Sequence, residues 1–117
     1  AGLEVKEKDQ DTYRKYRILA YTTGQYRAYQ NLVNQKIYDM ALDSLISTIG
    51  RCEEYSSDAK ELGCEGEISD IQAKAEEALE AFKIDTEKAL EVYDMKDRTA
   101  YSKEIYQILD DAGLSEE

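Results

Sequence analysis

The chain has 117 residues, a formal net charge of −11 at pH 7, and neither histidine nor proline. The acidic balance makes nonspecific binding to nucleic acids or anionic membranes unfavourable, because affinity for a polyanion comes from neutralising its phosphates. The absence of histidine excludes Ser-His-Asp and Cys-His relays, HExxH zinc sites and di-iron sites of the Glu-x-x-His type. We therefore expect no enzyme, no metal and no cofactor.

The composition predicts an all-α fold. Hydrophobic residues make up 42% of the chain and charged residues 35%, a balance typical of helical rather than disordered proteins. Without proline, no residue lacks the backbone N–H that a long helix needs. We expect a small antiparallel three- or four-helix bundle, in one domain over residues 1–117 with frayed ends at 1–5 and 114–117. No apolar run approaches the length of about 20 residues that crosses a bilayer, so we expect a soluble chain.

The N-terminal third has helical spacing that is interrupted once. Its periodic residues are Tyr13, Tyr16, Leu19, Tyr26, Tyr29 and Val33. Between them, Thr22-Thr23-Gly24 combines two β-branched residues with a glycine, which together weaken a helix by roughly 1 to 2 kcal/mol, so we expect a kink there. After this segment we expect a turn over residues 34–36. The alternative is one helix over residues 25–62, which would exceed about 50 Å at the helical rise of about 1.5 Å per residue.

Three further helices are predicted by spacings of three and four residues. The first has the apolar face Ile37, Ala41, Leu45, Thr48, Cys52, Tyr55, Ala59 and Leu62, and we expect it to stop near Gly63, where glycine can take the left-handed conformation. The second is a long helix with the stripe Ile68, Ile71, Ala75, Ala78, Phe82, Ala89 and Val92, interrupted at Asp85. The third begins near Asp97, which can cap it, and ends at Gly113.

Residues 32–45 resemble the middle of a tetratricopeptide repeat. They read LVNQKIYDMALDSL, so that an apolar pair ends one helix, a short turn follows, and Tyr38 and Ala41 take the places of the Tyr-x-x-Ala-Leu motif that opens the next helix. The match covers about half of a 34-residue repeat, and Lys36 stands where the family usually has glycine. The resemblance implies antiparallel helix pairs and a protein-binding scaffold. A plain three- or four-helix bundle unrelated to this family is the alternative.

The two cysteines do not determine the cellular compartment of the protein. In a straight helix, Cys52 and Cys64 would have α-carbons about 15 Å or more apart, beyond the limit of about 7 Å for a disulfide. A break at Ser56-Ser57 would let the chain fold back and form a Cys52–Cys64 disulfide, which implies an oxidising compartment. The other interpretation is one buried thiol in the core and one in a turn. Because the chain begins Ala1-Gly2 without Met, an extracytoplasmic part of a secreted or anchored protein is one of the alternatives.

Positive charge and tyrosine are concentrated near the N-terminus. Residues 1–36 have a net charge of +3 and residues 37–117 a net charge of −14, and residues 13–30 hold four Lys or Arg, no acid and five of the ten tyrosines. The pattern Tyr-Arg-x-Tyr occurs there twice, and such residues are common at the energetic centres of interfaces. The candidate partner-binding residues are therefore Tyr13, Arg14, Tyr16, Arg17, Tyr26, Arg27 and Tyr29, with the arginines expected to meet carboxylates on the partner.

Helical geometry limits this prediction. The two copies of the pattern are 13 residues apart, which turns a helix by about 220° at 3.6 residues per turn, so they face different ways unless the kink realigns them. In the alternative, one copy packs into the acidic bundle and the other faces solvent. Stacking of single-stranded nucleic acid on the tyrosines is a third and weaker interpretation.

The sequence favours a non-enzymatic protein-interaction or scaffold module that binds a protein partner. One alternative is a structural or oligomerising segment that associates with copies of itself through the stripe from Ile68 to Val92. Others are a helical sensor of a small ligand and an acidic secretion-type chaperone. The acidic residues Glu76, Glu77, Glu80 and Glu87 have helical spacing, but a solvated helix face explains them, so we assign no catalytic residue.

Overall fold

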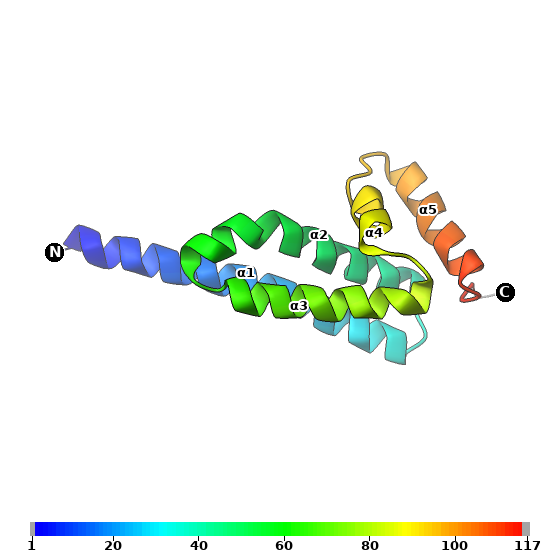
Figure 1. Ribbon diagram of the computed structural model, residues 1–117, viewed down its shortest axis with the longest axis horizontal. Helices are drawn as coiled ribbons and strands as arrows, with labels where there is room; N and C mark the ends of the chain where they lie inside the picture. The colour runs from blue at the N-terminus through cyan, green and yellow to red at the C-terminus, as the bar shows by residue number, and fades with distance from the viewer. Residues whose placement is uncertain (1, 116–117) are drawn as a thin grey trace.

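The computed structural model describes the backbone of residues 2–115 and the side chains of residues 9–115. The elements are α1 (Gly2–Asn34), α2 (Tyr38–Leu62), α3 (Glu65–Ala78), the 3₁₀ helix η1 (Leu79–Phe82), α4 (Thr86–Tyr93) and α5 (Arg98–Asp111). The predicted all-α fold is confirmed. Helices α1, α2 and α3 form an antiparallel three-helix bundle, and helices α4 and α5 lie at the end of the bundle where α1 turns into α2 (Figure 1).

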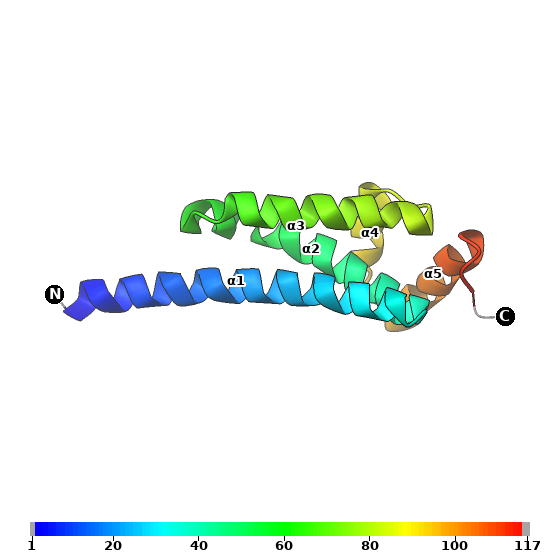
Figure 2. The same ribbon diagram turned by 90° about the horizontal axis from the view of Figure 1, so that it is seen from below.

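Helix α1 runs without a break through Thr22-Thr23-Gly24, so the predicted kink is wrong (Figure 2). Thr22 is fully buried, and its hydroxyl donates to the backbone oxygen of Ile18 at 2.9 Å. The threonine therefore satisfies its polar group within the helix while its methyl group packs against the bundle. Burial of the inner face outweighs the weak local helix propensity, as is usual for helices in proteins.

The predicted turn between α1 and α2 is confirmed, and a single helix over residues 25–62 is excluded. The backbone N–H of Ile37 donates to Leu32 O at 2.9 Å, and that of Lys36 donates to Val33 O at 2.9 Å. Lys36 has φ 62°, a left-handed conformation that costs a non-glycine residue roughly 1 to 2 kcal/mol. This is the position where the tetratricopeptide resemblance leads one to expect glycine.

Helix α2 ends where it was predicted to end. Gly63 follows Leu62 with φ 75°, the left-handed conformation that glycine takes without a steric cost. The helix is continuous through Ser56-Ser57, so the break that a disulfide would require is absent. Cys52 and Cys64 are both free thiols, and both are buried.

The prediction of one long helix from Ile68 to Val92 is wrong, because the chain turns between η1 and α4. Lys83 takes a left-handed conformation with φ 58°. Asp85 then caps α4 by accepting a hydrogen bond from the backbone N–H of Lys88 at 2.8 Å. Asp85 thus starts a helix, as a short acceptor side chain can, and does not merely interrupt an apolar stripe.

The apolar stripe of this region is used inside the molecule. Its fully or almost fully buried members are Ile68, Ala75, Phe82, Ala89 and Val92, and the neighbouring Leu79 is also buried. Most of them pack with the buried faces of α2 and α5 in the main core, and Ile68 belongs to a smaller cluster near Cys52 and Cys64. The stripe is therefore not a free surface for self-association, contrary to what the oligomerising alternative requires.

Helix α5 begins and ends as predicted. The carboxylate of Asp97 accepts hydrogen bonds from the backbone N–H groups of Thr99 at 2.9 Å and Ala100 at 3.2 Å, and Gly113 is left-handed with φ 75°. The ends that were expected to fray are described only in part. Leu114 packs against the core, the backbone is helical from Gly2, and residues 1, 116 and 117 lie outside the described range.

Two glycines within helices predict opposite effects of the same substitution. A Cβ at position 24 would meet no heavy atom within 4 Å, whereas a Cβ at position 50 would overlap the ring of Tyr93. Gly24→Ala should raise the free energy of unfolding by about 0.5 to 1 kcal/mol through helix propensity. Gly50→Ala should lower it by about 1 to 3 kcal/mol, because overpacking outweighs the same gain. Urea denaturation of both variants checks this, and equal shifts in the two would contradict the packing of Tyr93 on Gly50.

Candidate partner-binding face

The two copies of the Tyr-Arg-x-Tyr pattern lie in different environments. The side chains of Tyr13 and Tyr16 are 63% and 70% exposed. Tyr29 is 8% exposed and lies edge-on to Phe82, with 6.4 Å between ring centroids. Tyr26 is half-buried beside Tyr29, at 5.8 Å between centroids. One copy thus packs into the bundle and the other faces solvent, so Tyr29 is a core residue and not part of a surface.

Arg14 contacts carboxylates of its own chain. Its guanidinium lies 3.3 Å from Asp11, 3.7 Å from Asp58 and 3.9 Å from Glu61. All of these side chains are largely exposed, and exposed pairs contribute little to stability. Arg14 therefore connects α1 to the C-terminal end of α2, which makes it a weaker candidate for meeting a partner than the sequence suggested.

Arg17 and Arg27 remain exposed cations on α1. Within residues 9–115, neither forms an ion pair. The guanidinium of Arg17 lies over the ring of Tyr13, 5.9 Å from its centroid, so the two side chains form one amphipathic unit. Arg27 lies farther along α1, where it lines a hollow together with Tyr26 and with Lys74 of α3.

Three residues of this region were missed by the sequence reasoning. Tyr21 of α1 and Tyr55 of α2 meet edge to face, with 6.4 Å between centroids and an interplanar angle of 89°. Arg51 of α2 lies over the Tyr21 ring, 5.2 Å from its centroid. The spacing of four residues from Arg17 to Tyr21, and again from Arg51 to Tyr55, was a signal for a shared helix face. The spacing does not show which two helices pack together.

These side chains form a shallow hollow between α1 and α2, which we call the tyrosine face. It is lined by Tyr13, Tyr16, Arg17, Ala20, Tyr21 and Tyr55. Four of its six residues are tyrosines, and one is a cation without a carboxylate partner in the described part of the chain. Such a surface can bury aromatic area and can pair with an anionic group.

A polar network holds one edge of the tyrosine face in place. Arg51 pairs with Glu54 at 3.1 Å, and Glu54 accepts a hydrogen bond from the hydroxyl of Tyr93 at 2.9 Å. The ring of Tyr93 lies against Gly50. Burial, together with the hydrogen bond to Glu54, raises the pKa of Tyr93 to about 12. The network links α4 to the tyrosine face through α2.

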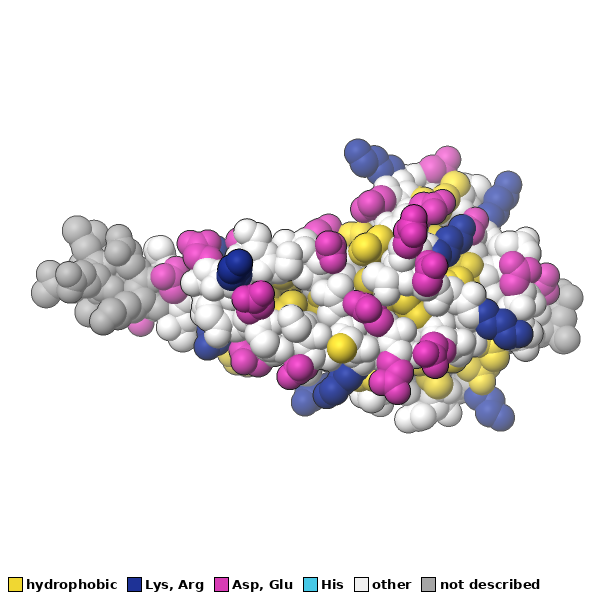
Figure 3. Space-filling model, in the orientation of Figure 1, with side chains coloured by type: hydrophobic (Ala, Val, Ile, Leu, Met, Phe, Trp, Pro, Cys, Tyr) yellow, Lys and Arg dark blue, Asp and Glu magenta, His cyan; other side chains and the backbone are white. Residues whose placement is uncertain are grey.

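Positive and negative charge are separated along the sequence. Residues 12–37 contain five Lys or Arg and no carboxylate. Asp and Glu side chains, with Lys and Arg among them, are spread over the face formed by α2, α3 and α4 (Figure 3). Among residues 9–115, no three side chains of the metal-binding types are placed to hold a metal ion. None of the helices described here combines the length and the apolar character that a membrane crossing demands.

The chain matches no model of a known protein family, and neither a curated protein nor a solved structure is significantly similar to it. The resemblance of residues 32–45 to a tetratricopeptide repeat therefore stays a prediction. The geometry of the tyrosine face is the feature that bears on function.

Two tyrosines with raised pKa values, the half-buried Tyr93 and the buried Tyr101, predict a loss of stability at high pH. The pKa of Tyr93 is raised from 10.0 to about 12. A neutral Tyr93 therefore stabilises the fold below pH 10, and this contribution is lost as the pH rises through about 12. Burial and a hydrogen bond to Asp43 also raise the pKa of Tyr101. We expect the free energy of unfolding to fall between about pH 10 and 12.

The test is urea denaturation across this pH range. Tyr93→Phe should show a shallower decline than wild type, because it cannot ionise. Tyr16→Phe is the matched control, since the Tyr16 side chain is 70% exposed. Removal of its hydroxyl group should leave the decline in the free energy of unfolding unchanged. A Tyr93→Phe curve parallel to wild type would contradict the environment assigned to Tyr93.

Proposed function

We propose that the protein is a non-enzymatic interaction module that binds a protein partner through the tyrosine face. The observation that carries this proposal is the exposure of three neighbouring tyrosines on α1. Tyr13, Tyr16 and Tyr21 are 63%, 70% and 37% exposed, and they lie beside Arg17 in one hollow. The tyrosine face lies beside the C-terminal part of α2, where Arg14 meets Asp58 and Glu61, and α1 extends beyond this end of the bundle (Figure 2).

The residue types support this function on energetic grounds. Tyrosine and arginine are enriched at interface positions whose loss costs most, because each buries a large area and also offers a hydrogen bond. The inner face of α1 already supplies its share of the core through Ile18, Thr22 and Tyr29. The outward tyrosines therefore have no role in that core, and a partner would bury them.

A scaffold role of the tetratricopeptide type is a form of the same proposal. The turn at Lys36, followed by Tyr38 at the start of α2, joins two long antiparallel helices. Helix α1 alone has 33 residues, about the length of a whole 34-residue repeat. The resemblance thus supports a helical hairpin that presents a surface, and not an array of regular repeats.

The experiment is affinity enrichment with the immobilised protein, followed by mass-spectrometric identification and titration of the purified partner. We expect Tyr13→Ala/Tyr16→Ala/Arg17→Ala to weaken the partner's binding at least about tenfold, because the central aromatic anchors are removed. Arg14 is left intact, since it pairs within its own chain.

The matched control is Lys103→Ala/Gln107→Ala, which removes two exposed side chains from α5, away from the tyrosine face. It should bind the partner as wild type does, and circular dichroism should show that all variants fold. A partner held equally by the triple variant would move the interface to the acidic faces. Failure of wild type to bind any protein would argue against an interaction module.

A further inference from the structure

A second group of exposed apolar side chains lies at the other end of the bundle. Among the described residues, the large hydrophobics that remain exposed are Tyr13, Tyr16 and Tyr21 of the tyrosine face, together with Met40 at 56% and Tyr106 at 59%. Met40 lies at the start of α2 and Tyr106 on α5, at the end opposite the start of α1 (Figure 1). From Tyr16 to the end of α1 is about 27 Å at 1.5 Å per residue. Each molecule therefore has two separate surfaces with exposed apolar side chains.

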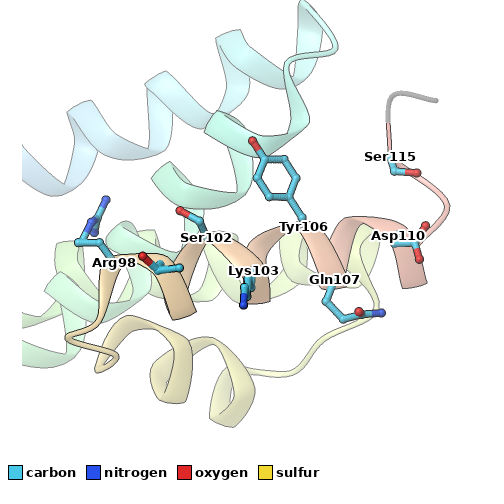
Figure 4. Close-up of a pocket in the computed structure, with 8 residues that line it drawn as sticks. Arg98, Ser102, Lys103, Tyr106, Gln107, Asp110 and Ser115 are labelled. Atoms are coloured by element: carbon cyan, nitrogen blue, oxygen red, sulfur yellow. The ribbon is translucent and has the colours of Figure 1, made fainter.

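The second surface is concave and carries acidic groups at its rim. We call it the α2–α5 hollow, a cavity of about 160 Å³ lined chiefly by Asp39, Met40, Asp43, Tyr101, Ile105 and Tyr106. The almost fully buried side chains of Ile105 and Tyr101 form its apolar floor. Tyr106 and Ser102 point to the α2 side of α5, whereas Lys103 and Gln107 point to the other side (Figure 4).

The carboxylates of the rim keep capacity for further hydrogen bonds. Asp43 accepts from the hydroxyl of Tyr101, and Asp39 accepts a long hydrogen bond of 3.4 Å from Tyr106. An ionised carboxylate offers about four acceptor sites, so each can accept from an additional donor. The one cation of the lining, Arg98, lies over the ring of Tyr101 at 4.8 Å, and the two carboxylates outnumber it.

The tyrosine face is a poor match for a second tyrosine face. The one charged residue of its lining is the cation Arg17, so a symmetric pairing would bring two arginines together without a carboxylate between them, which is destabilising. The α2–α5 hollow offers what that face lacks. It has a recess that can receive an aromatic ring, a methionine that can contact it, and carboxylates for Arg17.

We propose that the tyrosine face of one molecule docks into the α2–α5 hollow of a second copy, head to tail. This inference rests on the proposed function and names its partner. A tyrosine ring from Tyr13 or Tyr16 enters the recess beside Met40 and Ile105, and Arg17 pairs with Asp39 or Asp43. Because the two surfaces are different and lie at opposite ends, the contact is heterologous, and it generates open chains rather than a closed two-fold dimer.

The contact is small and charge-dependent. Three tyrosines meeting one tyrosine and one methionine form an interface at the low end of the size range, where complexes are weak and reversible. Raising the salt from about 0.15 M to about 1 M shortens the Debye length from about 8 Å to about 3 Å. We therefore expect self-association that grows with protein concentration and weakens at high salt.

Sedimentation velocity of two complementary variants tests the proposal. Tyr13→Ala/Tyr16→Ala removes the face and keeps the hollow, and Met40→Ala/Tyr106→Ala removes the hollow and keeps the face. Wild type should grow past the dimer as its concentration rises. Each variant alone should associate at least about tenfold more weakly, and their equimolar mixture should form a 1:1 complex and nothing larger. Lys103→Ala/Gln107→Ala, on the other side of α5, should behave as wild type.

Every other outcome overturns the head-to-tail contact. Self-association of the hollow variant alone would show that the face pairs with itself, and self-association of the face variant alone would show that the hollow does. If a double variant folds poorly, the single substitution of the exposed Arg17, Arg17→Glu, tests whether charge attraction contributes to the contact. Monomeric wild type at every concentration refutes this inference. The proposed function then survives only if affinity enrichment still captures a different protein through the tyrosine face.

Discussion

The rotation of α1 about its own axis decides which side chains this protein offers to its surroundings. Thr22 and Tyr29 are buried against the bundle, Thr22 with its hydroxyl satisfied inside the helix. Because residues 13 apart differ by about 220° around a helix, seating the tyrosines of the second Tyr-Arg-x-Tyr copy in the bundle turns those of the first copy outward. The exposure of Tyr13 and Tyr16 is therefore a consequence of core packing at the other end of the same rigid helix.

The side of the tyrosine face that lies across from α1 depends on α2 and α4. Gly50 lets the ring of Tyr93 lie directly against the α2 backbone, and Tyr93 then donates to Glu54, which holds Arg51 over Tyr21. A side chain at position 50 would displace the ring and with it the end of this network. Stability and surface geometry are therefore linked here, since the contact that seats α4 also orients the edge of the proposed interface.

Sequence reasoning succeeded where the signal was local and failed where two distant segments meet. Gly63, Asp97 and Gly113 end or begin helices through their own backbone and capping properties, so their roles could be recognised without knowing the fold. The kink at Thr22-Thr23-Gly24 was wrong because burial, which depends on α2 and α3, outweighs propensity. The long helix over η1 and α4 was wrong because Asp85 was treated as an interruption and not as a cap. Tyr21, Tyr55 and Arg51 form one cluster only after α1 and α2 pack, so nothing in either segment alone could assign them.

The net charge limits how far head-to-tail contacts can extend. Each molecule has a net charge of −11, and this repulsion acts between whole bodies at distances comparable to the Debye length, whereas Arg17 and a rim carboxylate attract each other only at contact. Salt near physiological strength, with a Debye length of about 8 Å, screens the first interaction more than the second. Long chains accumulate net charge with every added molecule, so growth becomes less favourable as a chain lengthens. The net charge thus favours short assemblies, and short assemblies leave terminal tyrosine faces free for other acidic partners.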